Sequence, residues 1–172
     1  MEKMEYIKYI AEKLYDKFMS KGNSENGVSL DIMKLVEELG GVVYEAGYIK
    51  MNQNSMIVNP EDNSFKIYVS ASEGIRRQKF TIAHEIGHYF IHYKGGDPEK
   101  PQTVYYRTSW AAGGSKEYEA NIFAANLLMP EKEFKKIFNN CNEDLSIVAD
   151  EFGVSIAAAE VRARSLGLIG NG

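Results

Sequence analysis

Residues 81–92 read TIAHEIGHYFIH and contain the pattern H-E-x-x-H within a stretch that favours a helix. Four residues of an α-helix advance about 400° and about 6 Å, so His84 and His88 project from one face, one turn apart. Two imidazoles at this separation can bind one ion at Zn–N distances of about 2.0–2.1 Å. Glu85 lies about 100° round the helix from His84, which suits proton transfer from water better than metal ligation. The pattern therefore predicts a metal-dependent hydrolytic site.

The third metal ligand has to come from elsewhere, because a catalytic zinc site uses three protein ligands and keeps one position open. His92 shares the helical face of His88, but its Cα lies about 12 Å along the axis from that of His84. Metzincins place a third histidine six residues after the second, where this chain has Lys94. We therefore expect His92 to be structural, to face substrate or to support the ligands, while a carboxylate from another element completes the site.

A second predicted helix, at residues 115–129, offers that carboxylate. Ser115 is a candidate N-cap, and two consecutive alanines at 124 and 125 allow close packing against the histidine helix. Glu117 and Glu119 lie about 200° apart, so only one of them should face the ion. Spacing alone does not select between them, since each is also a favourable charge near a helix N-terminus.

Two stretches together resemble the ImmA/IrrE family of metallopeptidases: RRQKFTIAHEIGHYFIH at 76–92 and EANIFAANLLMP at 119–130. The similarity runs from about Ser29 to the C-terminal segment ending at Ile169. The resemblance implies that the acidic residue before Ala-Asn, here Glu119, is the third zinc ligand. It also implies a zincin-like fold and cleavage of a helix-turn-helix repressor in a phage, mobile-element, stress or toxin–antitoxin system. The connection at 94–115 does not match the family pattern.

The predicted mechanism is peptide hydrolysis with one Zn²⁺ per chain, held by His84, His88 and Glu119, and manganese is compatible with the same ligands. Glu85 is the expected general base, which accepts the water proton and passes it to the leaving amine. Candidates for an oxyanion stabiliser or a supporting residue are Tyr89, His92, Tyr105, Tyr106 and Arg107.

The long connection at 94–115 contains Trp110 besides two of these tyrosines. Loops of this length inside a compact domain often have a function. Its aromatic residues are consistent either with a lid over a bound peptide or with a loop that they pin to the surface, and the sequence favours neither.

The whole chain predicts an α+β fold. Helices are expected at 6–20, 29–39 with Ser29 as a candidate N-cap, 72–93, 115–129, 131–138, 143–152 and 155–166. Strands are expected at 41–49, 55–59 and 65–70, and a turn at 59–64 joins the last two. We therefore predict a zincin-like core with a small antiparallel sheet of about three strands and a C-terminal helical pair.

A length of 172 residues favours one metallopeptidase domain over 1–172. Its expected parts are N-terminal helices at 1–40, the small sheet at 41–71, the metal-site helices with their connecting loop at 72–130, and a helical substrate-docking unit at 131–172. The last two helices resemble a helix-turn-helix around Gly153. Only five basic residues against seven acidic ones follow Pro130, which is a poor footprint for DNA, so packing or repressor docking is the better interpretation.

The composition excludes several classes of protein. Twenty basic and 24 acidic residues give a net charge of −4, so we expect no direct binding to nucleic acid. The sequence has no run of about 18 apolar residues and begins MEKMEY, so neither a membrane span nor a signal peptide is expected. Cys141 is the single cysteine and cannot form an intrachain disulfide, which agrees with a cytoplasmic location.

These observations predict a zinc-dependent endopeptidase that cleaves one specific protein, a DNA-binding repressor. The alternative is a non-proteolytic, metal-containing regulator that binds a repressor or toxin partner. An open coordination position would favour the enzyme, and a fourth protein ligand would favour the regulator. A third interpretation, DNA binding through residues 143–166, predicts salt-sensitive binding to duplex DNA.

Overall fold

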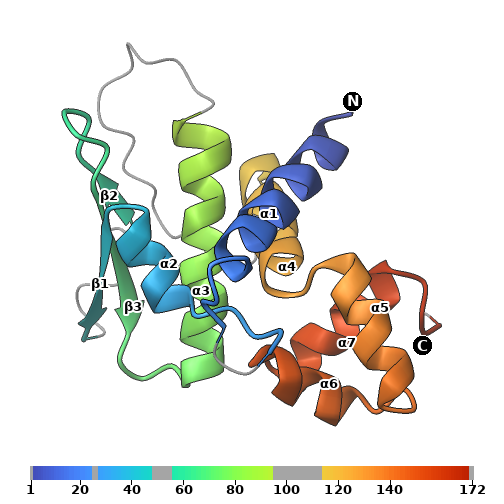
Figure 1. Cartoon of the computed structure of the whole chain (residues 1–172). Coiled ribbons are helices and arrows are strands. Elements are labelled where there is room, and N and C mark those ends of the chain that lie inside the picture. Colours follow the sequence, from blue (N-terminus) through green and yellow to red (C-terminus); the bar gives the residue numbers. More distant parts are fainter. Residues whose placement is uncertain (1, 25–26, 48–55, 95–113, 171–172) are drawn as a thin grey trace.

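The computed structural model describes residues 2–24, 27–47, 56–94 and 114–170, and it places a long helix between a small sheet and further helices (Figure 1). The elements are α1 (Lys3–Met19), α2 (Ile32–Glu38), β1 (Gly41–Ala46), β2 (Met56–Val58), β3 (Phe65–Ser70), α3 (Ile75–His88), η1 (Tyr89–Tyr93), α4 (Ser115–Leu128), α5 (Glu131–Asn140), α6 (Leu145–Phe152) and α7 (Ile156–Ser165). The central helix α3 packs on β3 and on α4, and α1 also packs on α4. This is the α+β fold that the sequence predicts.

The sheet has three strands in the order β1-β3-β2 and is mixed, so the prediction of an antiparallel sheet is wrong for one pair. β2 and β3 form the expected hairpin, with Asn63 in the left-handed region at φ 59° in the turn. β1 instead pairs with β3 in parallel, from Gly41 opposite Phe65 to Ala46 opposite Ser70. The reason is that β3 lies in the middle of the sheet and separates β1 from its neighbour in sequence, β2.

Neither serine that was predicted as an N-cap caps its helix, and Ser115 is the first residue of α4, after Gly114. Asp31 caps α2, its side chain accepting a hydrogen bond from the Lys34 amide, while Ser29 lies just before the helix. Ser29 is buried and accepts a hydrogen bond from Lys79 Nζ at 2.7 Å, while its own hydroxyl donates to the carbonyl of Phe152 at 3.2 Å. This network joins the segment before α2 to α3 and α6, because a buried hydroxyl and a buried ammonium need polar partners.

The helix expected at 72–93 changes its winding at its end. α3 is α-helical as far as His88, and the next residues form η1, a π-helical turn in which the Lys94 amide donates to the carbonyl of Tyr89 at 2.9 Å. Such turns add one residue to a helical turn and are frequent at functional sites. η1 contains His92 and leads into the part of the chain that the structure does not describe.

The C-terminal helices α5, α6 and α7 form a cluster beyond the end of α4 (Figure 1). Arg162 of α7 is buried there and donates from Nε to the carbonyl of Met129 and from Nη2 to Asn126 Oδ1, at 3.0 and 2.8 Å. The cluster is therefore packed onto the helix that follows the histidine motif in the chain. Within the described ranges, no helix combines the length and the apolar character needed to cross a membrane.

Candidate metal centre

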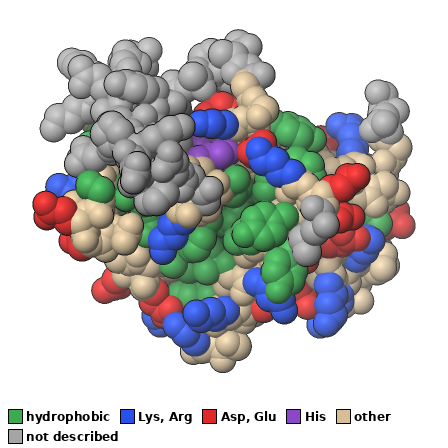
Figure 2. All heavy atoms as spheres, turned by 90° about the horizontal axis from the view of Figure 1, so that it is seen from above, with side chains coloured by type: hydrophobic (Ala, Val, Ile, Leu, Met, Phe, Trp, Pro, Cys, Tyr) green, Lys and Arg blue, Asp and Glu red, His purple; other side chains and the backbone are tan. Residues whose placement is uncertain are grey.

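The two histidines of the H-E-x-x-H pattern lie on one face of α3, as predicted. Their Nε2 atoms are 3.1 Å apart, and the rings meet edge to face with centroids 4.7 Å apart. The His88 side chain is 3% exposed and that of His84 is 15% exposed, so the pair opens to solvent on the His84 side. Seen from above, the histidine side chains are visible at the surface, beside lysine or arginine and acidic side chains (Figure 2).

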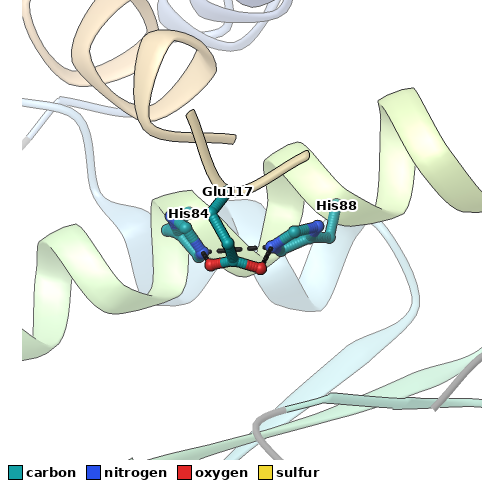
Figure 3. Close-up of side chains that lie close together, drawn as sticks. All are labelled: His84, His88 and Glu117. Carbon is teal, nitrogen blue, oxygen red and sulfur yellow. Dashed lines mark hydrogen bonds and ion pairs between the residues drawn. The ribbon is translucent and has the colours of Figure 1, made fainter. Parts of the chain in front are cut away.

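Glu117 of α4 points at both imidazoles and completes a group of three donor atoms (Figure 3). Its Oε2 lies 3.1 Å from His84 Nε2, and its Oε1 lies 3.2 Å from His88 Nε2. Ligand atoms placed tetrahedrally around Zn²⁺ at about 2.0–2.1 Å are about 3.3 Å from one another. The spacing of the three donor groups therefore fits a single cation of this size.

The far side of each imidazole ring is also hydrogen-bonded. His84 Nδ1 lies 2.8 Å from Asn121 Oδ1, and His88 Nδ1 lies 2.9 Å from His92 Nδ1. An amide oxygen can only accept, so in the neutral ring His84 Nδ1 carries the proton and Nε2 keeps a lone pair. Since that lone pair faces a carboxylate, a cation at this point would remove an unfavourable contact between acceptors.

Glu119 points away from the two ligand candidates, which differs from the role that the resemblance implies for it. Its Oε2 lies 2.9 Å from His92 Nε2, and its Oε1 forms an ion pair with Lys3 of α1 at 2.5 Å. The cause is the helical phase of α4: two residues separated by about 200° cannot both face α3. The face that α4 turns to α3 presents Glu117 together with Asn121, one turn later.

Comparison with known proteins shows the family of this chain. Residues 36–164 match the family described as the IrrE N-terminal-like domain (Peptidase_M78). The chain belongs to the ImmA/IrrE family. A search of curated proteins gave no match.

One solved structure with the same fold is a transcriptional regulator from Mycobacterium tuberculosis, with a TM-score of 0.56 and 16% sequence identity. The match covers 90% of this chain and 45% of that chain, so this ImmA/IrrE member spans less than half the length of the regulator. The family indicates a peptidase-type protein with a metal site, and at this identity the likeness to the regulator concerns the fold.

Electrostatics distinguish the two histidines of this ImmA/IrrE site. Burial lowers the pKa of His84, but the hydrogen bond that its ring donates to Glu117 and the charge of Glu85 outweigh this effect, so the pKa lies above the ordinary value. Burial and the nearby positive charge of His84 lower the pKa of His88 to about 3. A proton on the pair therefore resides on His84, and His88 presents a neutral ring for metal binding.

His92 and Glu119, which are hydrogen-bonded to each other beside His88, also differ in their charge states. Burial lowers the pKa of His92 despite its hydrogen bond to Glu119. Burial acts to raise the pKa of Glu119, but the contacts with Lys3 and His92 outweigh this effect. The pKa of Glu119 therefore lies below the ordinary value. Glu119 is therefore a carboxylate and His92 a neutral ring at neutral pH.

The remaining predicted site residues fall into three groups. Glu85 is 3% exposed and close enough for its charge to raise the pKa of His84. Tyr89 is a core residue, and its hydroxyl donates to the carbonyl of Asn63 in the β2–β3 turn at 3.0 Å. The others, Tyr105, Tyr106, Arg107 and Trp110, lie outside the described residues.

Sequence reasoning did not single out Asn121 and Lys3. Asn121 follows Glu117 by four residues, so helical periodicity puts an amide and a carboxylate on one face of α4 and was a usable signal. No local pattern marks Lys3, because its contact with Glu119 joins two helices that are far apart in the chain.

Proposed function

We propose that this chain is a zinc-dependent endopeptidase that cleaves a specific helix-turn-helix repressor in the cytoplasm. The observation that carries the proposal is the convergence of His84 Nε2, His88 Nε2 and the Glu117 carboxylate at 3.1–3.2 Å. Two imidazoles and one carboxylate are a common ligand set of catalytic zinc, and three protein ligands leave a fourth position for water or substrate. Manganese is compatible with the same donors.

In the proposed mechanism, metal binding and proton transfer are carried out by different residues. A zinc ion held by His84, His88 and Glu117 would supply Lewis acidity for the scissile carbonyl and would lower the pKa of a water molecule toward about 7. Glu85 accepts the proton of that water and donates it to the leaving amine, since it directly follows His84 on α3 and lies within electrostatic reach of it. The Glu85 side chain is buried and belongs to the same helix as the two histidines.

The protein substrate is inferred from the family, from the similar fold of a transcriptional regulator and from the charge of the C-terminal segment. A peptidase family implies a polypeptide substrate, and the similar fold in a transcriptional regulator of M. tuberculosis supports a setting in gene regulation. The helices α5–α7 are the proposed docking unit for the repressor. The acidic balance of residues after Pro130 supports contact with protein in preference to DNA.

The decisive experiment incubates the zinc-loaded chain with the repressor encoded beside its gene, with and without a chelator, and follows cleavage by mass spectrometry. Glu85→Gln should bind zinc as wild type does, because Glu85 is not one of the ligands, and should lose cleavage by a factor of at least about 100. Wild-type cleavage by a zinc-loaded Glu85→Gln variant would refute the assigned base. Repressor binding by the zinc-loaded wild type without any cleavage would favour the non-proteolytic regulator.

A further inference from the structure

We propose that His92 and Glu119 form a hydrogen-bonded relay that fixes the tautomer and ring orientation of the metal ligand His88, and that neither residue binds the metal. The inference rests on the proposed metal site and assigns to Glu119 a role different from that of a ligand. His88 Nδ1 lies 2.9 Å from His92 Nδ1, and His92 Nε2 lies 2.9 Å from Glu119 Oε2. The relay ends at Lys3, which pairs with the other oxygen of Glu119.

When His92 is neutral, one arrangement of protons satisfies these contacts. A carboxylate can only accept hydrogen bonds, so His92 Nε2 donates to Glu119. A neutral His92 then has a lone pair on Nδ1, which makes His88 Nδ1 the donor of the next bond. His88 is therefore left with its lone pair on Nε2, the atom that faces His84 and Glu117.

The relay does for His88 what Asn121 does for His84. Asn121 Oδ1 accepts from His84 Nδ1, so both ligand candidates have an acceptor behind the ring and a lone pair in front of it. The two chains of hydrogen bonds differ in length. His84 is bonded directly to a side chain of α4, whereas His88 is bonded to Glu119 of α4 through His92. Both supports begin on α4, within one turn of Glu117.

Burial makes the relay effective. The side chains of His92 and Glu119 are each 6% exposed, so water cannot easily replace either partner, and hydrogen bonds in such surroundings are strong. The π-helical turn η1 carries His92 from the end of α3 to a ring distance of 5.0 Å from His88. Ser115 also donates to Glu119 Oε1, which holds the carboxylate on its own helix.

The test measures metal affinity instead of activity. Purified full-length variants are titrated with Zn²⁺ against a chromophoric chelator and with Co²⁺, whose visible spectrum reports the ligand set. His92→Phe and Glu119→Leu should each weaken binding about 10- to 100-fold, as expected when a group behind a ligand is lost. Combining them should weaken binding no further than either change alone, since both break the same chain of hydrogen bonds.

A conservative variant of Glu119 distinguishes a role in the relay from a role as a metal ligand. Glu119→Gln keeps an acceptor oxygen for His92 and should bind metal within a few-fold of wild type, with an unchanged Co²⁺ spectrum. Glu117→Gln should lose more than about 100-fold, because an amide is a poor replacement for a zinc-binding carboxylate. Glu160→Gln serves as the matched control, since it removes an acidic partner of an ion pair on the distant helix α7.

Two results would overturn the relay while leaving the metal site in place. One is wild-type affinity in folded His92→Phe and Glu119→Leu, with folding checked by circular dichroism. The other is loss of the Co²⁺ spectrum in Glu119→Gln but not in Glu117→Gln, which would make Glu119 the ligand. A wild-type chain that binds neither metal would defeat the proposed function and the relay together.

Discussion

Gly87 sets how closely α4 approaches the histidines. A Cβ at this position would lie 3.1 Å from Phe123 Cβ and 3.2 Å from both Cα and the carbonyl oxygen of Ala120. The last two are backbone atoms of α4, so they cannot move without moving the helix that carries Glu117. The glycine between the two ligand histidines therefore contributes to the metal site through packing.

We predict that Gly87→Ala destabilises the protein by up to about 2 kcal/mol and weakens metal binding on the order of tenfold. Overpacking costs about 1–3 kcal/mol, and the better helix propensity of alanine offsets about 1 kcal/mol of it. Urea unfolding and zinc titration measure the two effects. Gly170→Ala is the control, because a Cβ there meets nothing within 4 Å. Equal behaviour of the two variants would contradict the prediction.

The sequence predicted His84, Glu85 and His88 because their spacing within one helix fixes their relative directions. It could not choose between Glu117 and Glu119, since that choice depends on how α4 is rotated about its axis when it packs on α3. Family resemblance pointed to Glu119, and the structure brings Glu117 to the imidazoles instead. The direction of β1 was missed for the same kind of reason, because strand order is a tertiary property that hydrophobic patterns do not encode.

Helix α1 is held to the segment that follows it by Tyr15. The Tyr15 hydroxyl donates to the carbonyl of Val28 at 2.9 Å, and its ring is buried in the core. Burial, with smaller contributions from Glu133 and Asp16, raises the pKa of Tyr15 to about 12. The helix boundaries agreed with the sequence to within a few residues, whereas a contact like this one depends on the fold.

We predict that Tyr15 makes the free energy of unfolding decrease as the pH rises in the alkaline range. The folded-state pKa is higher than the value of about 10 in unfolded chains, so the contribution of Tyr15 is complete below pH 10 and is lost as the pH rises toward 12. The free energy of unfolding should fall by up to about 1.4 kcal/mol per pH unit in this window. Urea unfolding of wild type and Tyr15→Phe from pH 9 to 11.5 measures it. A difference between the two proteins that stays constant over this range would argue against it.

At the scale of the molecule, the metal site joins elements from separate parts of the chain. α3 supplies the histidines, α4 supplies Glu117, α1 packs on α4, and α7 is hydrogen-bonded to the end of α4 through Arg162 (Figure 1). A cation that binds only when α3 and α4 are docked must stabilise the whole arrangement, because the unfolded chain does not present the three donors together.

We therefore predict a rise in thermal stability on zinc binding. Free zinc at 100 times its dissociation constant contributes about 2.7 kcal/mol, which corresponds to a Tm increase of about 5–10 °C for a chain of this size. Differential scanning calorimetry with zinc and then with excess chelator tests this. The increase should persist in Glu85→Gln and disappear in His88→Ala. The same increase in His88→Ala would show that the ion binds elsewhere.

The ion pair between Lys3 and Glu119 has a practical consequence for handling the protein. Lys3 lies in the first turn of α1, and its contact with Glu119 puts the start of that helix next to the histidines. An affinity tag fused ahead of α1 would therefore project beside the metal centre and, if rich in histidine, would offer competing ligands. A tag after α7, which packs on α6 and on the far end of α4, is the better choice for measuring metal content.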